Sequence, residues 1–218
     1  MIPRGETVQQ GPKSARTRAR LKSTAFKLFR EDGFSNTTLR AIASESGLSL
    51  GSAYYYVESK DDLARELFDE LVSELRAGLA SALAEGNTLE HNLRTLWDGL
   101  LDAVEPYPDC GVAFLRSRPT LPPDGGAAIE SAIDSARPQA PLPIRQDLPK
   151  LVGLVTHAIL AFWASDTSPG KRRSRLLVRR AAPLTSRVAV LSRLPVVRTL
   201  LDELLGLVRA VAPRHAGS

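Results

Sequence analysis

The sequence predicts an all-α protein with two domains. Apolar residues recur every three or four positions in several segments of this 218-residue chain, a spacing that lines one face of a helix. No segment shows the sustained alternation of apolar and polar residues that is typical of a half-buried strand. With 43% hydrophobic residues, the chain can form its core without disulfides or structural metals.

The first predicted helix begins near Ser14 and ends near Gly33. It follows an arm over 1–13, which contains Gly and Pro and lacks an apolar period, so we expect that arm to be flexible. The remaining positions of the helix are rich in Lys and Arg, which makes its outer side basic. The residues expected on its buried face are Leu21, Ala25, Leu28 and Phe29.

Two short helices follow, with a tight turn between them. Thr37 or Thr38 is expected to cap the first, because a side-chain oxygen at that position accepts a hydrogen bond from a free backbone N–H. Gly47 ends this helix, since glycine adopts the left-handed conformation without strain. Ser49 is expected to cap the second short helix.

A longer helix begins after the capping residue Ser59 and runs to about Leu83, far enough to connect two domains. Its apolar stripe consists of Leu63, Leu67, Leu71, Leu75 and Leu79. Another helix is predicted over 89–104, and Pro106 and Pro108 break the chain after it.

The later part of the chain begins with a proline-rich stretch. Residues 119–149 hold 7 of the 15 prolines and are predicted to form a loop with one short helix near 127–136. Pro183 is expected to kink or split a later helix. Helical periodicity returns, partly in heptad-like steps, over 148–162, 177–191 and 194–211.

The distribution of charge along the chain is uneven. Residues 1–60 carry 10 basic and 5 acidic side chains, 61–170 carry 8 and 17, and 171–218 carry 11 and 2. A basic head is typical of nucleic-acid contact at one end of a protein, because Lys and Arg neutralise phosphates. For the basic cluster over 171–180 we expect a solvated helix face or pairing with the acidic middle, and contact with nucleic acid is the alternative.

Composition also limits the compartment and the kinds of site. Cys110 is the single cysteine, which excludes an intramolecular disulfide and any multi-cysteine zinc or iron–sulfur site. The N-terminus has no apolar core for a signal peptide. The most apolar run, 151–164, is shorter than the ~20 residues that cross a bilayer. We therefore expect a cytoplasmic protein with no membrane partner.

The segment from Ser35 to Leu63 has the pattern of a helix-turn-helix, in which the second short helix enters the major groove of DNA. This segment, together with the helix before it, resembles the tetracycline-repressor (TetR) family of transcriptional regulators in detail over 14–65. The residues that carry the resemblance are Phe29, Gly33, Phe34, Thr38, Ile42, Ala43, Gly47, Ser49, Gly51, Ser52, Tyr54, Tyr56, Ser59 and Lys60.

The resemblance implies a DNA-binding domain over 14–60, with its motif over 38–57, and a palindromic double-stranded DNA operator as the partner. Thr38 and Lys60 are expected to hold backbone phosphates from helix N-termini. Arg40 is the candidate for a base edge, since a guanidinium meets guanine O6 and N7 with two hydrogen bonds. The other residues expected at the DNA are Ser49, Leu50, Gly51, Ser52, Tyr54, Tyr55 and Tyr56.

Several positions depart from the family pattern or have a second interpretation. Leu50 stands where a basic or polar residue is common, and it is a candidate for contact with a thymine methyl. Ala53 and Val57 are smaller than usual, which predicts a looser core. Tyr54 is expected to be partly in that core. The operator sequence does not follow from this helix.

The second domain, 61–218, is implied by the resemblance to bind an effector and to dimerise. The helix over 59–83 would link it to the DNA-binding domain. Part of 145–211 is expected to form the homodimer interface. The effector is an unknown small molecule, and His157 is the candidate for a polar group in its pocket. Plain core packing is the alternative for the ligand-binding candidates, which are Trp97, Phe114, His157, Phe162 and Trp163.

No catalytic residues, metal site or cofactor are predicted. The three histidines are far apart in the sequence, and no metal-binding, phosphate-cradling or nucleophile motif is present. Cys110 has no neighbouring basic residue, so an inert thiol is expected. The predicted function is a ligand-responsive repressor of transcription. The alternatives are a helical small-molecule-binding protein or enzyme without specific DNA binding, and a DNA-binding regulator that responds to no effector.

Overall fold

The computed structural model describes residues 12–83, 86–117 and 121–192, together with positions 194, 199, 200, 203 and 206. The described residues form helices and connecting turns, with no strand among them. The all-α prediction is therefore confirmed for this part of the chain. Nearly all of the predicted arm and most of the helix predicted over 194–211 lie outside the described residues.

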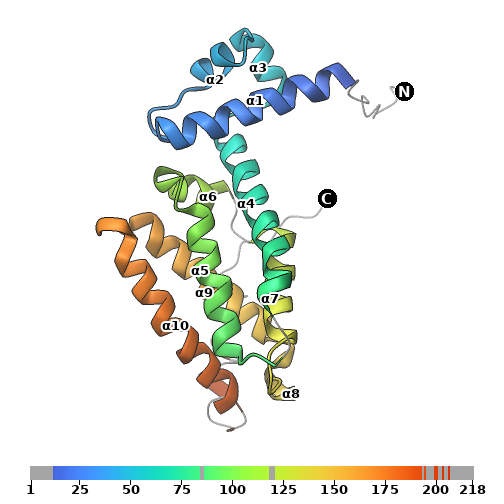
Figure 1. Cartoon of the computed structure of the whole chain (residues 1–218), viewed down its shortest axis with the longest axis vertical. Coiled ribbons are helices and arrows are strands. Elements are labelled where there is room, and N and C mark those ends of the chain that lie inside the picture. Colours follow the sequence, from blue (N-terminus) through green and yellow to red (C-terminus); the bar gives the residue numbers. More distant parts are fainter. Residues whose placement is uncertain are drawn as a thin grey trace.

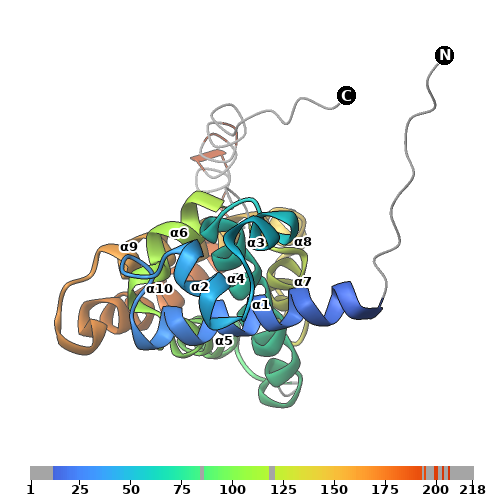
Figure 2. The ribbon, with the colours of Figure 1, turned by 90° about the horizontal axis from the view of Figure 1, so that it is seen from above.

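The first four helices follow the predicted pattern closely. Their bounds are Pro12–Glu31 for α1, Leu39–Glu45 for α2, Leu50–Tyr56 for α3 and Lys60–Ala82 for α4. Figure 1 shows α1, α2 and α3 grouped at one end of the molecule, with α4 running from this group into the remaining helices. Figure 2, seen from above, shows α1 lying across that end with α2 and α3 beside it.

The remaining helices form a bundle around the lower part of α4 (Figure 1). Two short 3-10 turns precede α6 and α10, namely η1 (Pro108–Cys110) and η2 (Pro169–Lys171). The helices of this bundle are α5 (Leu89–Val104), α6 (Gly111–Ser117), α7 (Pro123–Asp134), α8 (Leu142–Arg145), α9 (Leu148–Ser165) and α10 (Arg172–Leu191).

Four differences from the predicted elements concern this bundle. Helix α6 occupies a stretch for which the sequence predicted no helix, and α8 lies within the predicted loop. Helix α7 begins at Pro123, earlier than expected, because a proline at the first helical position has no hydrogen bond to lose. Helix α10 begins at Arg172 and continues through Pro183 without a break, so the expected split is wrong.

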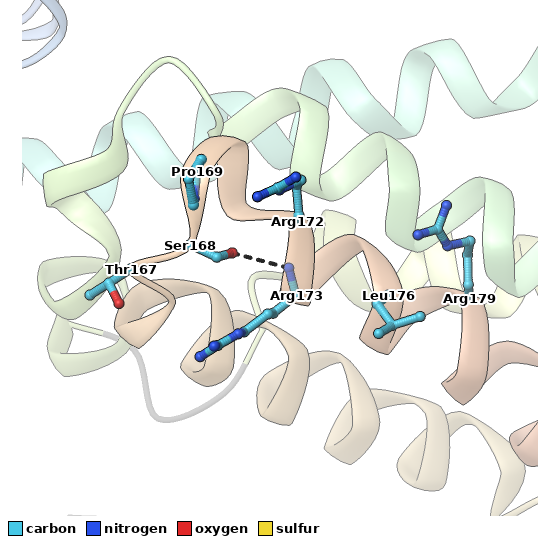
Figure 3. Close-up of a pocket in the computed structure, with 7 residues that line it drawn as sticks. All are labelled: Thr167, Ser168, Pro169, Arg172, Arg173, Leu176 and Arg179. Atoms are coloured by element: carbon cyan, nitrogen blue, oxygen red, sulfur yellow. Dashed lines mark hydrogen bonds between the residues drawn. The ribbon is translucent and has the colours of Figure 1, made fainter.

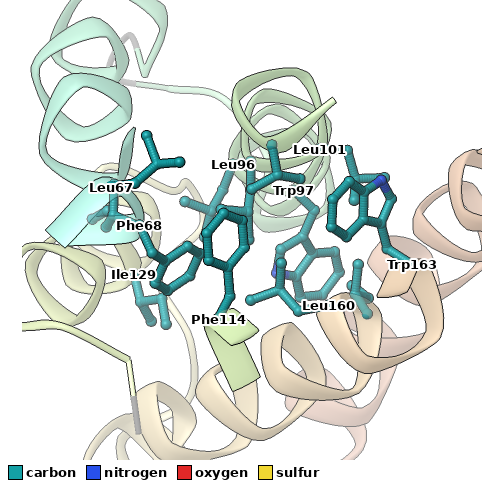
Figure 4. Close-up of a cluster of buried hydrophobic side chains, with 14 of the residues drawn as sticks. Leu67, Phe68, Leu96, Trp97, Leu101, Phe114, Ile129, Leu160 and Trp163 are labelled. Atoms are coloured by element: carbon teal, nitrogen blue, oxygen red, sulfur yellow. The ribbon is translucent and has the colours of Figure 1, made fainter. Parts of the chain in front are cut away.

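The core of the bundle lies between α4, α5, α6, α7 and α9 (Figure 4). Trp97 of α5 is fully buried, and its indole Nε1 donates to Thr156 Oγ1 of α9 at 2.9 Å. Phe114 of α6 stacks on Phe68 of α4, with 5.0 Å between ring centroids. Aromatic side chains from four helices thus fill the interior, and each brings a large apolar area out of water.

Helix α9 is the one described helix whose length and composition would allow it to cross a membrane. At 18 residues it is longer than the apolar run recognised in the sequence. Several of its side chains are buried in the bundle, as expected for the central helix of a packed domain. The buried positions are Leu148, Leu151, Val152, Thr156, Ile159, Leu160 and Trp163.

Candidate DNA interface and effector domain

Hydrogen bonds between residues close together in the sequence stabilise the helix-turn-helix. Thr38 Oγ1 accepts from Ala41 N at 3.1 Å and caps α2, and Ser49 Oγ accepts from Ser52 N at 3.1 Å and caps α3. Gly47 lies between the helices with φ of 65°, a backbone conformation that glycine adopts without strain. These local contacts set both ends of α2 and the start of α3, as predicted.

One side of α3 is buried and the other faces solvent. Ala53 is fully buried, and Val57, which follows directly on α3, is also buried. On the outer side, Tyr54 is 57% and Tyr55 is 70% exposed, so the expectation that Tyr54 lies partly in the core is wrong. Tyr56 takes that place instead, half-buried against the core and edge-on to Tyr55.

Most of the predicted DNA-contacting residues are exposed, whereas Leu50, Tyr56 and Lys60 are half-buried. Arg40 is exposed on α2, and Leu50 is half-buried at the start of α3. A Cβ added at Gly51 would meet no atom within 4 Å, so the surface there is open to an approaching ligand. The residues exposed at this end of the molecule are Thr38, Arg40, Ser49, Gly51, Ser52, Tyr54 and Tyr55.

Lys60, the second predicted phosphate ligand, is engaged within the domain. Its ammonium donates to Phe34 O at 2.8 Å and to Thr37 O at 2.9 Å, and it lies 4.2 Å from the Phe34 ring centroid. Two of its three N–H donors are therefore used to hold the segment between α1 and α2 against the start of α4. No sequence signal pointed to this contact, because the partners are 26 and 23 residues away.

Helix α1 is fastened to α4 through part of its basic surface. Arg18 pairs with Glu66 and Lys22 with Glu70, both across the contact between these helices. Lys27, on another side of α1, reaches Glu45 of α2 at 3.4 Å. The basic outer side predicted from the sequence thus serves partly to hold the DNA-binding domain together.

The DNA-binding domain also touches the bundle around η1 and α6. Asp109 of η1 lies against Gly33, at the end of α1, so closely that a Cβ at position 33 would be 2.6 Å from Asp109 Oδ2. Arg30 lies over the Tyr107 ring at 6.0 Å from the centroid, and Arg116 of α6 pairs with Asp61 of α4 at 3.5 Å. This junction was not predicted, because the sequence shows no helical period over the residues that form η1 and α6.

The predicted effector ligands are only partly brought together. Trp97, Phe114 and Trp163 lie in the core of the bundle, each at most 3% exposed (Figure 4). Phe162 points away from that core and is 39% exposed, and His157 is half-buried on α9. The structure therefore places three of the candidates in the packed interior and two toward the surface.

Two surface pockets of the bundle are open to solvent. One, of about 600 Å³, lies at the start of α10, and the other, of about 510 Å³, lies on α5. None of the five predicted effector ligands lines either pocket. The described residues contain no group of three or more His, Cys, Asp or Glu placed to hold a metal ion.

Comparisons with known proteins bear on both domains. The family model for bacterial regulatory proteins of the tetR family matches residues 21–67. A model for a tetracyclin repressor-like C-terminal domain matches residues 125–207. The HTH-type transcriptional repressor KstR2 of Rhodococcus jostii (strain RHA1) is 36% identical over 87 residues, which are 38% of this chain and 43% of that repressor. The match thus spans less than half the length of that relative.

A solved structure shares the fold at lower sequence identity. The crystal structure of a TetR transcriptional regulator from Rhodococcus sp. RHA1 aligns with a TM-score of 0.57 and 18% identity, over 78% of this chain and 96% of that one. A bacterial regulatory protein of the tetR family from Rhodococcus RHA1 has a TM-score of 0.48 and 17% identity, over 80% and 97% of the two chains. Since one family model covers the helix-turn-helix and another covers much of the bundle, this chain belongs to the TetR family of bacterial regulatory proteins.

Proposed function

We propose that the chain acts in the cytoplasm as a homodimeric, sequence-specific DNA-binding repressor, released from its operator by a small-molecule effector. The observation that carries the proposal is α3, a capped helix with Ala53 buried beneath it and exposed tyrosines on its outer side. A helix with one face held in a small core and the other free is what entry into a major groove requires. KstR2, the relative that matches the N-terminal part, is itself a transcriptional repressor.

Direct contacts with DNA would come from the exposed end of the molecule. Arg40, which is exposed on α2, would meet a guanine edge, and Tyr55 would contact a phosphate or a thymine methyl. Thr38 and Ser49 already cap their helices, so the phosphates they approach would also meet the partial positive charge of a helix N-terminus. Lys60 would contribute its remaining N–H to the same backbone.

Dimerisation would use the exposed apolar faces of α9 and α10, which pack side by side. Leu154 and Phe162 of α9 are 37% and 39% exposed, and Leu184 and Leu191 of α10 are 63% and 48% exposed. Large apolar side chains concentrated on two neighbouring helices are typical of a surface that a partner covers. Two such faces related by a two-fold axis would form a four-helix interface.

Effector control would act through α4, which is shared by the two domains. Its first turns hold Lys60, the partners of α1 and the contact of Asp61 with α6, whereas its later turns contact α5 and α7. A ligand that shifts α4 would move the recognition helices of the dimer away from a separation of about 34–36 Å, one turn of DNA. Operator affinity would then fall in proportion to the ligand's preference for the shifted state.

The test is selection of genomic DNA fragments on the purified protein over a range of salt concentrations. Recovery of one palindrome, with affinity lost in Arg40→Ala and Tyr55→Ala, is the expected outcome. Arg94→Ala is the matched control, because Arg94 is exposed on α5 in the other domain and pairs only weakly with Asp98 at 3.7 Å. Bound fragments without a shared sequence, or equal losses in all three variants, would overturn the assignment of the interface.

Effector release is tested separately on the recovered operator. A library of small molecules is screened for compounds that raise the melting temperature of the protein and also release DNA, because a ligand that favours one state changes both. Crystal structures with and without such a compound should differ in the tilt of α4. Superimposable α4 helices would contradict the proposed mechanism while leaving DNA recognition intact.

A further inference from the structure

The pocket at the start of α10 is lined mostly by cationic and hydroxyl-bearing residues (Figure 3). Arg172 and Arg179 lie about two turns apart on α10, and Leu176 lies between them in sequence. The loop before the helix closes one end. The complete lining consists of Thr167, Ser168, Pro169, Arg172, Arg173, Leu176 and Arg179, and it contains no carboxylate.

The basic residues of this region divide into two kinds. Lys171 donates to Trp163 O at 2.9 Å and lies over the Trp163 ring, so its charge is held against α9. Arg175 pairs with Asp102 at 2.6 Å and with Glu105 at 3.2 Å on α5. Arg175 alone therefore accounts for the predicted pairing with the acidic middle of the chain, because the partners of Lys171 are a backbone carbonyl and an aromatic ring.

The other four arginines of this cluster differ from Lys171 and Arg175 in their surroundings. Among the described residues, no carboxylate lies within ion-pair distance of Arg172, Arg173, Arg179 or Arg180. The first three of these line the pocket, whereas Arg180 does not. Concentrating like charges on one surface disfavours the folded state unless an anion compensates them, because each charge repels the others.

The backbone at the start of α10 is already satisfied, so the pocket is a side-chain site. Arg173 N donates to Ser168 Oγ at 3.2 Å, and Ser174 N donates to Asp166 Oδ2 at 2.9 Å. Asp166 is buried behind the loop, and its other oxygen accepts from Ser168 N at 2.9 Å. Its carboxylate is therefore occupied by serine and backbone donors and leaves the guanidinium groups free.

We propose that this pocket binds a small organic molecule bearing a phosphate group. Guanidinium groups match phosphate because their planar N–H donors form two parallel hydrogen bonds with its oxygens. The volume of about 600 Å³ lies within the range of roughly 300–1,000 Å³ of small-molecule sites. Leu176 and Pro169 would contact the apolar part of the ligand, and the hydroxyl of Thr167 would add a further donor.

A series of residue contacts connects the pocket with the DNA-binding domain. The loop that closes it follows directly on α9, whose Trp163 and Ala164 lie against Gly111 at the start of α6. The residue before Gly111 ends η1, which carries Asp109 into contact with Gly33 of α1. Binding at the pocket itself does not depend on the repressor function.

The test is isothermal titration calorimetry of the full-length protein with inorganic pyrophosphate, at fixed ionic strength. Arg172→Gln and Arg179→Gln are each expected to raise the dissociation constant at least tenfold. Arg180→Gln is the matched control, because it removes the same charge from the neighbouring position without removing a lining residue. Melting curves establish that all three variants remain folded, so a loss of binding is not a loss of structure.

Three outcomes would overturn the proposal. One is the absence of saturable pyrophosphate binding to the unsubstituted protein. Another is an equal loss in Arg179→Gln and Arg180→Gln, which would mean that pyrophosphate responds only to the general charge of α10. The third is a loss of affinity for duplex DNA in Arg172→Gln and Arg179→Gln with pyrophosphate binding unchanged, which would assign these arginines to nucleic acid instead.

Discussion

Gly33 of the DNA-binding domain and Asp109 of the bundle are in direct contact, and the carboxylate of Asp109 fills the space that a side chain at position 33 would occupy. Gly33 also has φ of 84°, in the left-handed region. Gly33 therefore follows the end of α1 and also provides the space in which Asp109 of η1 packs. The contact joins the domain that would read DNA to the domain that would receive a signal.

Replacing Gly33 by alanine should both strain the backbone and displace Asp109. The strain alone is expected to lower the free energy of unfolding by about 1–2 kcal/mol. Gly47→Ala provides the control, because Gly47 has φ of 65° but no atom within 4 Å of an added Cβ. Chemical denaturation should give a larger loss for Gly33→Ala, and the excess should disappear in an Asp109→Ala background. An excess that persists there would show that Asp109 is not its source.

The hydroxyl of Thr156 should be required for the full stability of the core. It accepts a hydrogen bond from Trp97 Nε1 and donates one to Val152 O at 2.8 Å. Thr156→Val keeps the shape but leaves the indole N–H unpaired, which is expected to cost about 1–3 kcal/mol of stability in denaturant unfolding. Thr156→Ser retains the hydrogen bond and removes one methyl, for a loss of about 0.8 kcal/mol. A serine variant less stable than the valine variant would contradict this role.

Arg175 should stabilise the contact between α10 and α5. Its guanidinium meets Asp102 and Glu105 and also donates to Asp98 O at 3.2 Å. Arg175→Gln is expected to lower the free energy of unfolding by about 1 kcal/mol, and less at high salt because the ion pairs are then screened. Arg180→Gln, which breaks no ion pair, should change stability by at most about 0.5 kcal/mol. Equal effects of the two substitutions in thermal unfolding would exclude the network as the cause.

Cys110 should be unreactive in the folded protein. Burial, assisted by the nearby Asp109, raises the pKa of its thiol to about 12. Between pH values of about 9 and about 12, the folded state retains a thiol proton that the unfolded chain releases. The contribution of this group to the stability of the fold is therefore complete at neutral pH and is lost as the pH rises from about 9 to about 12. Labelling with a thiol reagent at pH 8 should proceed only as fast as the protein unfolds. Rapid labelling without unfolding would place the thiol in an accessible site.

The exposed apolar face of α10 should hold the proposed dimer together. Leu184→Asp is expected to produce monomers in sedimentation equilibrium, because a carboxylate in an apolar interface loses its hydration. Leu142→Asp is the control, since Leu142 of α8 is 76% exposed but lies outside the α9 and α10 faces. The monomer should also bind a palindromic operator more weakly. If Leu184→Asp forms a dimer with an unchanged dissociation constant, the interface lies elsewhere.

Short-range interactions explain which parts of the structure the sequence predicted well. The caps at Thr38, Ser49 and Ser59 form as expected, and α5 has the predicted bounds. Each cap joins a side chain to a backbone N–H three residues away, so the pattern is complete within a few positions of the chain. The same locality made the helix-turn-helix recognisable.

The features that were not predicted from the sequence depend on contacts with residues far away along the chain. Helix α6 has seven residues, too few for an apolar period to identify it, and it forms where Gly111 allows close approach to α9. Pro183 was expected to kink or split its helix, yet α10 is not split there and packs against α5 and α9. Packing of this kind outweighs local preference, and it is not visible in a single segment.

By itself the sequence determined the helical fold, the cap that begins the recognition helix and the family to which the chain belongs. Only the tertiary structure decided that Lys60 holds the α1–α2 segment, that Asp109 lies against Gly33, and that three arginines gather around one pocket. The reason is physical: helix caps and periods come from residues three or four apart, whereas a pocket or a domain junction exists only after distant helices have packed.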